Sequence, residues 1–214
     1  MDSNMPQQPA QQLAKKSNVK KIVIAIVIFW VVAGVVLVAI KGFGKRNYVD
    51  YTPIGDSGPY ASWVEYSSVP AGFSAIFPAK PSEVKDKMDP KNTEVDYDYY
   101  SYTAVDKEGS VFIVNHSKYA ASVNMSKPEN NLQNGLNAMI ESTPGNELIS
   151  SENSTFGDHK ATEFVLANSG IGITMKGWLI AVPEKKEMYQ LLYAHKGSGS
   201  EADFGKFVDS FKIK

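Results

Sequence analysis

VDYDYYSYTAV, residues 95–105, is the stretch that decides the fold of this chain. Aromatic and β-branched residues fill it, and these residue types are enriched in β-strands. A turn signal, Lys-Glu-Gly, follows at residues 107–109, and a second strand-like stretch runs from Val111 to Tyr119. Two strands joined by so short a turn pair antiparallel as a hairpin. We therefore expect the chain to build an antiparallel sheet outward from this hairpin.

Further strand candidates lie on both sides of the hairpin, separated from one another by Gly, Pro, Asn and Asp. They are Asn47–Tyr51, Ala61–Tyr66 and Phe73–Phe77 before it, and Leu148–Phe156, Lys160–Ala167, Gly172–Val182 and Glu187–His195 after it. Neighbouring strands joined by short turns pair antiparallel. The last four candidates therefore predict a meander.

Two helices are predicted among these strands. The first spans Pro128–Ser142, with an expected cap at Ser126, and its apolar residues form one stripe at helical spacing. That stripe consists of Leu132, Leu136, Met139 and Ile140. The second helix spans Glu201–Ser210, with Ser200 as its expected cap. The fold class is therefore α+β, an antiparallel β-sheet covered by helices.

An apolar run of 19 residues, Ile22–Ile40, precedes the strands, and Lys20, Lys21 and Lys41 bracket it. Its length matches the ~20 residues that a helix needs to cross a membrane. A signal peptide has a shorter apolar stretch of about 7–15 residues and a small-residue cleavage site. A buried helix of a soluble protein would normally carry a polar face. We therefore interpret Ile22–Ile40 as one retained transmembrane helix.

The transmembrane helix divides the chain into segments. Residues 1–21 are polar and predict a disordered cytoplasmic tail. Residues 41–71 predict a stalk with short leading strands, and residues 72–214 the α+β domain. Four Lys precede the span within its flank, against three Lys and Arg after it. This positive bias favours a cytoplasmic N-terminus, which places the domain outside the membrane of a cell that we expect to be bacterial.

The charge of the chain is strongly asymmetric. Residues 47–214 hold 15 Lys and Arg against 22 Asp and Glu, which gives the domain a net charge of −7. Nucleic-acid binding needs a basic surface, so nucleic acid is not an expected partner. The chain has no Cys, which excludes disulfides, thiolate metal sites and cysteine nucleophiles.

The domain resembles the PsbP-like superfamily. The resemblance rests on Phe73-x-x-x-Phe77-Pro78-x-Lys80-Pro81, the central helix, Tyr189-x-x-x-Tyr193, and Phe207-Val208-x-Ser210-Phe211. It covers residues 72–214 and implies an α/β/α sandwich around an antiparallel sheet. The family shares no catalytic residue set, so the resemblance carries over no site residue and favours binding over catalysis.

Candidate site residues are few. The three histidines, His116, His159 and His195, lack the spacing of a zinc site, so we expect turn and strand-surface histidines and no bound metal. Asp96 and Asp98 do not follow a calcium-loop spacing. Gly170-Ile171-Gly172 lacks the third glycine of a nucleotide loop, and no G-x-S-x-G motif provides a nucleophile. No catalytic, cofactor-binding or metal-binding residues are therefore nominated.

The tyrosines of residues 95–105 are the one candidate interaction surface. Tyr97 and Tyr99 share one face of the predicted strand, and Tyr100 and Tyr102 share the other. One pair is expected to enter the core. The other pair either stays exposed, as tyrosines at recognition surfaces do, or is covered by a helix or loop.

These observations together predict a membrane-anchored, non-enzymatic domain outside the cytoplasm, which docks a protein or another component of the cell envelope. Two alternatives stay open. A small-ligand carrier would have a large apolar cavity. An enzyme of an unrecognised type would have a cleft between sheet and helix, holding titratable groups with shifted pKa values.

Overall fold

The computed structural model describes residues 62–88 and 97–214. The expected transmembrane helix, the tail and the strand at Asn47–Tyr51 lie outside these residues. Within the described ranges, no helix is both long and apolar enough to cross a membrane.

A seven-stranded antiparallel sheet forms the centre of the fold, with the strand order β3-β4-β5-β9-β8-β7-β6. Its strands are β3 (Ser82–Met88), β4 (Tyr97–Val105), β5 (Val111–Tyr119), β6 (Asn146–Phe156), β7 (His159–Asn168), β8 (Ile173–Val182) and β9 (Glu187–Lys196). The predicted hairpin is β4–β5, and the predicted meander is β6 to β9. Both predictions are confirmed, because short turns do join consecutive antiparallel strands here.

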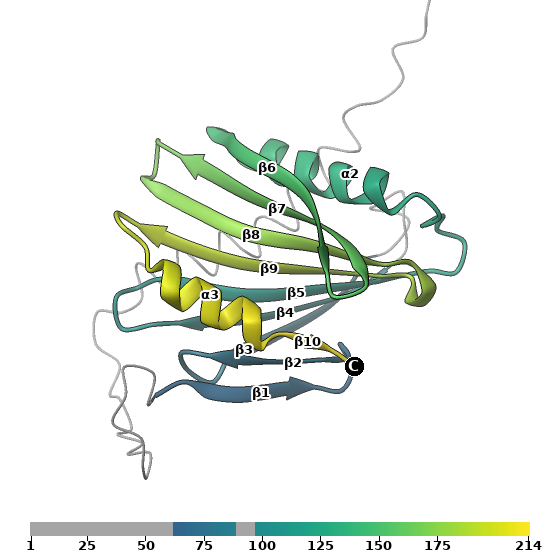
Figure 1. The fold of residues 1–214 in the computed structure, drawn as a ribbon, viewed down its shortest axis with the longest axis horizontal. Helices are drawn as coiled ribbons and strands as arrows, with labels where there is room; N and C mark the ends of the chain where they lie inside the picture. The colour runs from purple at the N-terminus through teal and green to yellow at the C-terminus, as the bar shows by residue number, and fades with distance from the viewer. Residues whose placement is uncertain (1–61, 89–96) are drawn as a thin grey trace, which may run out of the picture.

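The two helices lie on opposite faces of this sheet. Helix α2 (Pro128–Glu141) packs against β6, β7 and β8. Helix α3 (Glu201–Ser210) packs against the other face, where the ring of Phe207 contacts Phe112 of β5. Figure 1 shows α2 at the β6 end of the sheet and α3 in front of β9 and β5. A short 3-10 helix, η1 (Pro183–Lys185), joins β8 to β9.

A second, three-stranded sheet completes the layer that contains α3. It has the order β1-β2-β10, formed by β1 (Val64–Ser68), β2 (Phe73–Phe77) and β10 (Lys212–Ile213). The predicted strand at Ala61–Tyr66 corresponds to β1, which pairs with β2 along its whole length. The predicted boundary at residue 72 lies in the turn between these two paired strands.

The two helix starts differ in how their first N–H groups are satisfied. The Ser200 hydroxyl accepts a hydrogen bond of 3.1 Å from the N–H of Asp203, as predicted. The predicted cap at Ser126 is wrong. Lys127 occupies the N-cap position without a side-chain hydrogen bond, and the N–H of Ser126 itself donates to Asn124. Pro128 at the first helical position has no N–H, so one fewer donor needs a partner there.

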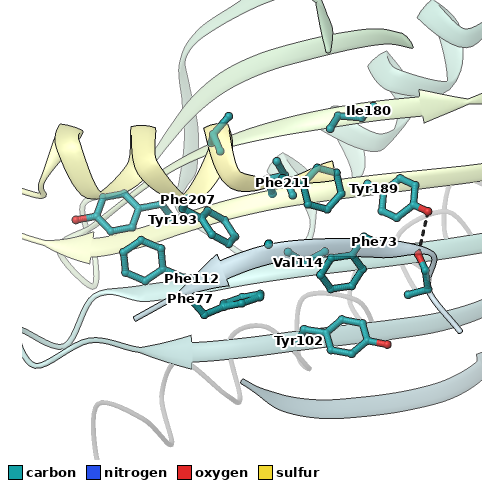
Figure 2. Close-up of a cluster of buried hydrophobic side chains, with 14 of the residues drawn as sticks. Phe73, Phe77, Tyr102, Phe112, Val114, Ile180, Tyr189, Tyr193, Phe207 and Phe211 are labelled. Atoms are coloured by element: carbon teal, nitrogen blue, oxygen red, sulfur yellow. Dashed lines mark hydrogen bonds between the residues drawn. The ribbon is translucent and has the colours of Figure 1, made fainter. Parts of the chain in front are cut away.

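The main core lies between the large sheet and the layer of α3 and the small sheet, and it is rich in aromatic rings. Figure 2 shows its central side chains, which are Phe73, Phe77, Tyr102, Phe112, Val114, Ile180, Tyr189, Tyr193, Phe207 and Phe211. A second core lies between α2 and the opposite face of the sheet, and it includes Leu132 and Leu136 of the predicted stripe.

Gly177 in β8 marks a close approach between strands that the sequence alone does not reveal. A Cβ atom on Gly177 would lie 2.6 Å from Cζ of Phe164 and 2.7 Å from the carbonyl oxygen of Leu191. Because a backbone oxygen cannot move aside easily, Gly177→Ala is expected to lower the free energy of unfolding by about 1–3 kcal/mol. Urea unfolding of the full chain in detergent, followed by tryptophan fluorescence, measures the change.

Gly205 provides the matched control for this prediction. It lies inside α3, and a Cβ atom there would meet nothing within 4 Å. Gly205→Ala is therefore expected to raise the free energy of unfolding by about 0.5–1 kcal/mol, because alanine loses less conformational entropy in a helix. A Gly177→Ala protein as stable as the wild type would contradict the close approach.

Candidate functional site

The four tyrosines of β4 are all buried, which corrects the expectation of an exposed tyrosine face. The exposed fractions are 4% for Tyr97, 1% for Tyr99, 7% for Tyr100 and 0% for Tyr102. Strand β4 is an inner strand between β3 and β5, so no edge of it is open to solvent. The alternative that both faces are covered therefore holds, and these tyrosines do not form a docking surface.

The two pairs of tyrosines differ in their hydrogen bonding. Tyr100 and Tyr102 enter the main core, and the Tyr102 hydroxyl lies 2.6 Å from the Ser68 hydroxyl of β1. Burial raises the pKa of Tyr102 to about 12. On the other face, the hydroxyls of Tyr97 and Tyr99 have no hydrogen-bond partner among the described residues, and burial raises the pKa of each.

A cluster of buried titratable groups lies beside Tyr100 and Tyr102 in the main core, where β5 and β9 pair. We call His116, Glu187 and Tyr189 the buried triad. His116 lies directly opposite Tyr189 in the strand register, and its ring centroid is 4.7 Å from that of Tyr189. Nε2 of His116 lies 3.4 Å from Oε2 of Glu187. That distance is long for a hydrogen bond.

Charge and hydrogen bonding set the protonation of Glu187. Burial alone would raise the pKa of this carboxyl, but the adjacent His116 lowers it, and the Tyr189 hydroxyl and the Lys118 ammonium lower it further. The net effect is a pKa below the ordinary value. Burial, and to a smaller extent the same carboxylate, raise the pKa of the Tyr189 phenol. Glu187 is therefore an anion and Tyr189 a neutral donor at neutral pH.

The triad connects the two sheets. The Tyr189 hydroxyl lies 2.9 Å from the carbonyl oxygen of Ala71 and 3.1 Å from Oε2 of Glu187. Ala71 lies in the turn between β1 and β2. The side chain of Tyr189 in the large sheet therefore hydrogen-bonds to the main chain of the small sheet (Figure 2). His116 is completely buried, which leaves no room for a substrate beside it. This arrangement can fix a loop, and it does not present a nucleophile to solvent.

The remaining histidines contact neutral or acidic groups. Nδ1 of His195 lies 3.0 Å from the carbonyl oxygen of Gly197, and His195 is 8% exposed. Burial lowers the pKa of His195; the Gly197 carbonyl opposes this shift, and the nearby Lys176 adds to it. His159 lies at the surface, with Nδ1 3.8 Å from Glu184. The expectation of surface histidines is therefore wrong for His116 and His195.

No three His, Cys, Asp or Glu residues of the described ranges meet as a metal site.

A cavity of about 330 Å³ opens between the start of α2 and the β6–β7 hairpin. Its lining residues are Glu129, Leu132, Asn153, Ser154, Thr155, Lys160 and Ala161. The Lys160 ammonium lies 3.6 Å from the Glu129 carboxylate, and both side chains are more than half exposed. An exposed ion pair contributes at most about 1 kcal/mol. Its lining is about half polar, whereas a carrier of small ligands would need a predominantly apolar pocket.

Sequence reasoning missed the buried triad, although part of its signal was present. Glu187 and Tyr189 are two residues apart on one strand, so they share a face. His116 is far from them in sequence, and only the register between β5 and β9 brings it opposite Tyr189. A correct pairing of these two strands would have placed a histidine beside a carboxylate in a core.

Comparisons with known proteins give structural likenesses only. No family model and no curated protein sequence matches the chain. The chain is similar to the solution structure of cyanobacterial PsbP (CyanoP) from Synechocystis sp. PCC 6803, with a TM-score of 0.48 and 13% identity, over 76% of this chain and 100% of that one. It is also similar to a protein of unknown function from Pseudomonas aeruginosa, with a TM-score of 0.37 and 13% identity, over 67% of this chain and 86% of that one. At this level of similarity, membership of the PsbP-like superfamily stays a prediction.

Proposed function

We propose that this protein is a single-pass membrane protein whose C-terminal domain lies outside the cytoplasm and docks a protein or another component of the envelope, without catalysing a reaction. One observation carries the proposal. An apolar run of 19 residues, Ile22–Ile40, precedes a folded acidic domain and has basic residues on both sides. A run of this length is stable across a bilayer, and the Lys residues before it favour a cytoplasmic N-terminus.

The positions of the titratable groups support binding rather than catalysis. The groups of the buried triad connect two sheets inside the domain, where no substrate reaches them. The cavity beside α2 holds an exposed Glu129–Lys160 ion pair, which lacks the enclosed environment that tunes catalytic groups. The family resemblance drawn from the sequence points in the same direction.

Membrane anchoring can make a weak contact between the domain and its partner sufficient for function. A tether of fixed length confines the domain to the layer next to the membrane, which raises its effective concentration toward a partner in the same layer. A contact of modest area then suffices. The net charge of −7 over residues 47–214 also keeps the domain away from an anionic membrane surface, so its faces stay available to a partner.

Fractionation of cells that make the full chain tests the anchor and its orientation. The protein is expected to stay in the membrane pellet after a carbonate wash, and protease added to intact cells is expected to digest residues 47–214. A Val31→Lys/Val35→Lys variant is expected to lose membrane retention, because each central Lys costs about 2.5–3.5 kcal/mol on insertion. The matched control, Gln7→Lys/Gln8→Lys, adds the same charges in the tail and is expected to stay in the pellet.

Two results would reject the proposal. One is wild-type protein in the soluble fraction after the carbonate wash. The other is a C-terminal domain that resists protease in intact cells but is digested once the cells are opened.

A further inference from the structure

The outer edge of β6 is an open strand edge within residues 62–88 and 97–214. Among these residues, β6 is the last strand of the seven-stranded sheet and pairs only with β7. Eight of its eleven residues are exposed, and residues 147–153 form one continuous exposed stretch. An edge strand presents a row of unpaired main-chain N–H and C=O groups, which is a template for another strand.

The usual protections of an edge strand are largely absent from β6. Natural edges are blunted by short length, by proline, by charged side chains, most often lysine, or by bulges, and of the charged residues β6 carries only Glu147 and Glu152. Strand β6 has no proline and no basic residue, and from Ser150 to Phe156 it pairs with β7 without a break. The bulge between Leu148 and Ser150 lies near one end and leaves the side chain of Ile149 61% exposed. A regular edge of about seven residues with an apolar side chain at one end is therefore available.

The negative charge beside the β6 edge favours a positively charged partner strand. Glu152 of β6 lies directly opposite Glu163 of β7, and like charges in this position repel each other. Glu147 lies opposite Ala167 and therefore on the same face of the sheet as Glu152 and Glu163. None of the three carboxylates forms an ion pair within the described residues. A strand added beside β6 with Lys or Arg at alternate positions would place its cations next to Glu152 and one strand further from Glu163.

Self-pairing of two β6 edges is disfavoured by the same residues. Strand β6 carries two carboxylates, Glu147 and Glu152, and no cation. Two such edges would bring four carboxylates together without a counter-charge, and opposed like charges destabilise strand pairing. The acidic edge therefore excludes a second copy and accepts a basic strand.

We propose that β6 is a docking edge, which adds an extended basic segment of a partner protein as an eighth strand of the sheet. Main-chain hydrogen bonds along residues 150–156 supply the affinity, and the carboxylates of Glu152 and Glu163 select cationic side chains at alternate positions. Ile149 favours an apolar residue at one end of the segment. This assignment rests on the proposed binding function and names the surface and the chemistry of the partner.

A designed peptide tests the docking edge. The probe is a fluorescent nine-residue peptide that alternates Lys and Thr and ends in Ile, added to the full chain in detergent micelles. Fluorescence anisotropy is expected to show saturable binding. Glu152→Gln/Glu163→Gln is expected to weaken this binding at least tenfold. Glu65→Gln/Glu108→Gln removes two exposed carboxylates of β1 and of the β4–β5 turn, and it is expected to leave the affinity unchanged.

N-methylated peptides test the strand pairing itself. In an added edge strand, alternate N–H groups point toward β6 and the others toward solvent. Methylation of one alternating set is expected to abolish binding, and methylation of the other set to leave it intact. Equal binding of both methylated peptides, or an equal loss in both Glu→Gln pairs, would overturn the docking edge. So would a lack of saturable binding, or a dimer of the full chain that the peptide does not dissociate. Each of these results leaves membrane anchoring as a separate question, answered by fractionation.

Discussion

Replacing Phe73 with alanine is expected to lower the free energy of unfolding by about 3–5 kcal/mol, the range for a large aromatic side chain removed from a core. Phe73 lies in β2 and is completely buried. Its ring centroid lies 4.9 Å from that of Tyr102 in β4 and 5.6 Å from that of Phe211 after α3. The substitution therefore leaves a cavity at the point where three distant segments of the chain meet.

Urea unfolding of the full chain in detergent measures this loss, with the midpoint and slope fitted together. The control is Val69→Ala, because Val69 lies in the neighbouring turn and is 90% exposed. That change is expected to alter stability by less than about 0.5 kcal/mol. A loss below about 1 kcal/mol for Phe73→Ala would show that β2 is not part of the cooperative core.

The local elements of this fold were predictable from the sequence because they depend on neighbouring residues. The alternation in residues 95–105 and the turn at Lys107–Gly109 specify a hairpin, and the same rules specify the meander from β6 to β9. Helix α3 matched its predicted bounds, since Ser200 caps it and Phe204, Phe207 and Val208 recur at helical spacing. Each of these signals extends over only a few residues.

The second sheet was missed because its pairing is not local. Strand β10 has only two residues, Lys212 and Ile213, and pairs with β2, more than 130 residues earlier in the chain. Strand β3 also escaped prediction, because its sequence, SEVKDKM, alternates charges with few apolar residues. As an edge strand of the large sheet, β3 needs little apolar surface, so the usual hydrophobic alternation is weak there.

The candidate sites also depend on contacts between residues that are far apart in the sequence. A period of two assigns Tyr97 and Tyr99 to one face of β4, but it cannot say what covers that face. The cover of Tyr102 comes from β1 and β2, which lie in another layer. The open edge of β6 was equally hidden, since the order of strands in a sheet decides which strand is last. Sequence therefore predicted the elements, and tertiary packing decided which residues are accessible.

Replacing Glu187 with alanine is expected to lower the free energy of unfolding by about 3 kcal/mol at pH 7, near the upper end of the cost of leaving buried polar groups without a partner. Removal of the buried carboxylate leaves the groups around it without their acceptor. Here His116 loses its carboxylate neighbour at 3.4 Å, and the Tyr189 hydroxyl loses one of its two acceptors. The contact between Tyr189 of β9 and the turn between β1 and β2 is weakened as a result.

The pH dependence of stability separates the effect of the charged Glu187 carboxylate from a simple packing loss. The pKa of Glu187 is lower in the folded state than its ordinary value of 4.5. The stability that its charge contributes is therefore fully present above about pH 4.5 and is lost as the pH falls through the folded-state pKa. Urea midpoints of wild type and Glu187→Gln, which keeps the shape of the side chain, are expected to differ at pH 7 and to converge below pH 4.5.

Glu184→Gln is the control for this convergence, because the Glu184 carboxylate is 60% exposed and contacts only the surface His159 in its ion pair. Its substitution is expected to change stability by less than about 0.5 kcal/mol at either pH. A difference between wild type and Glu187→Gln that stays constant from pH 7 to pH 3 would contradict a charged Glu187. The carboxyl would then act through shape and neutral hydrogen bonding, and the triad would connect the two sheets without a charged carboxylate.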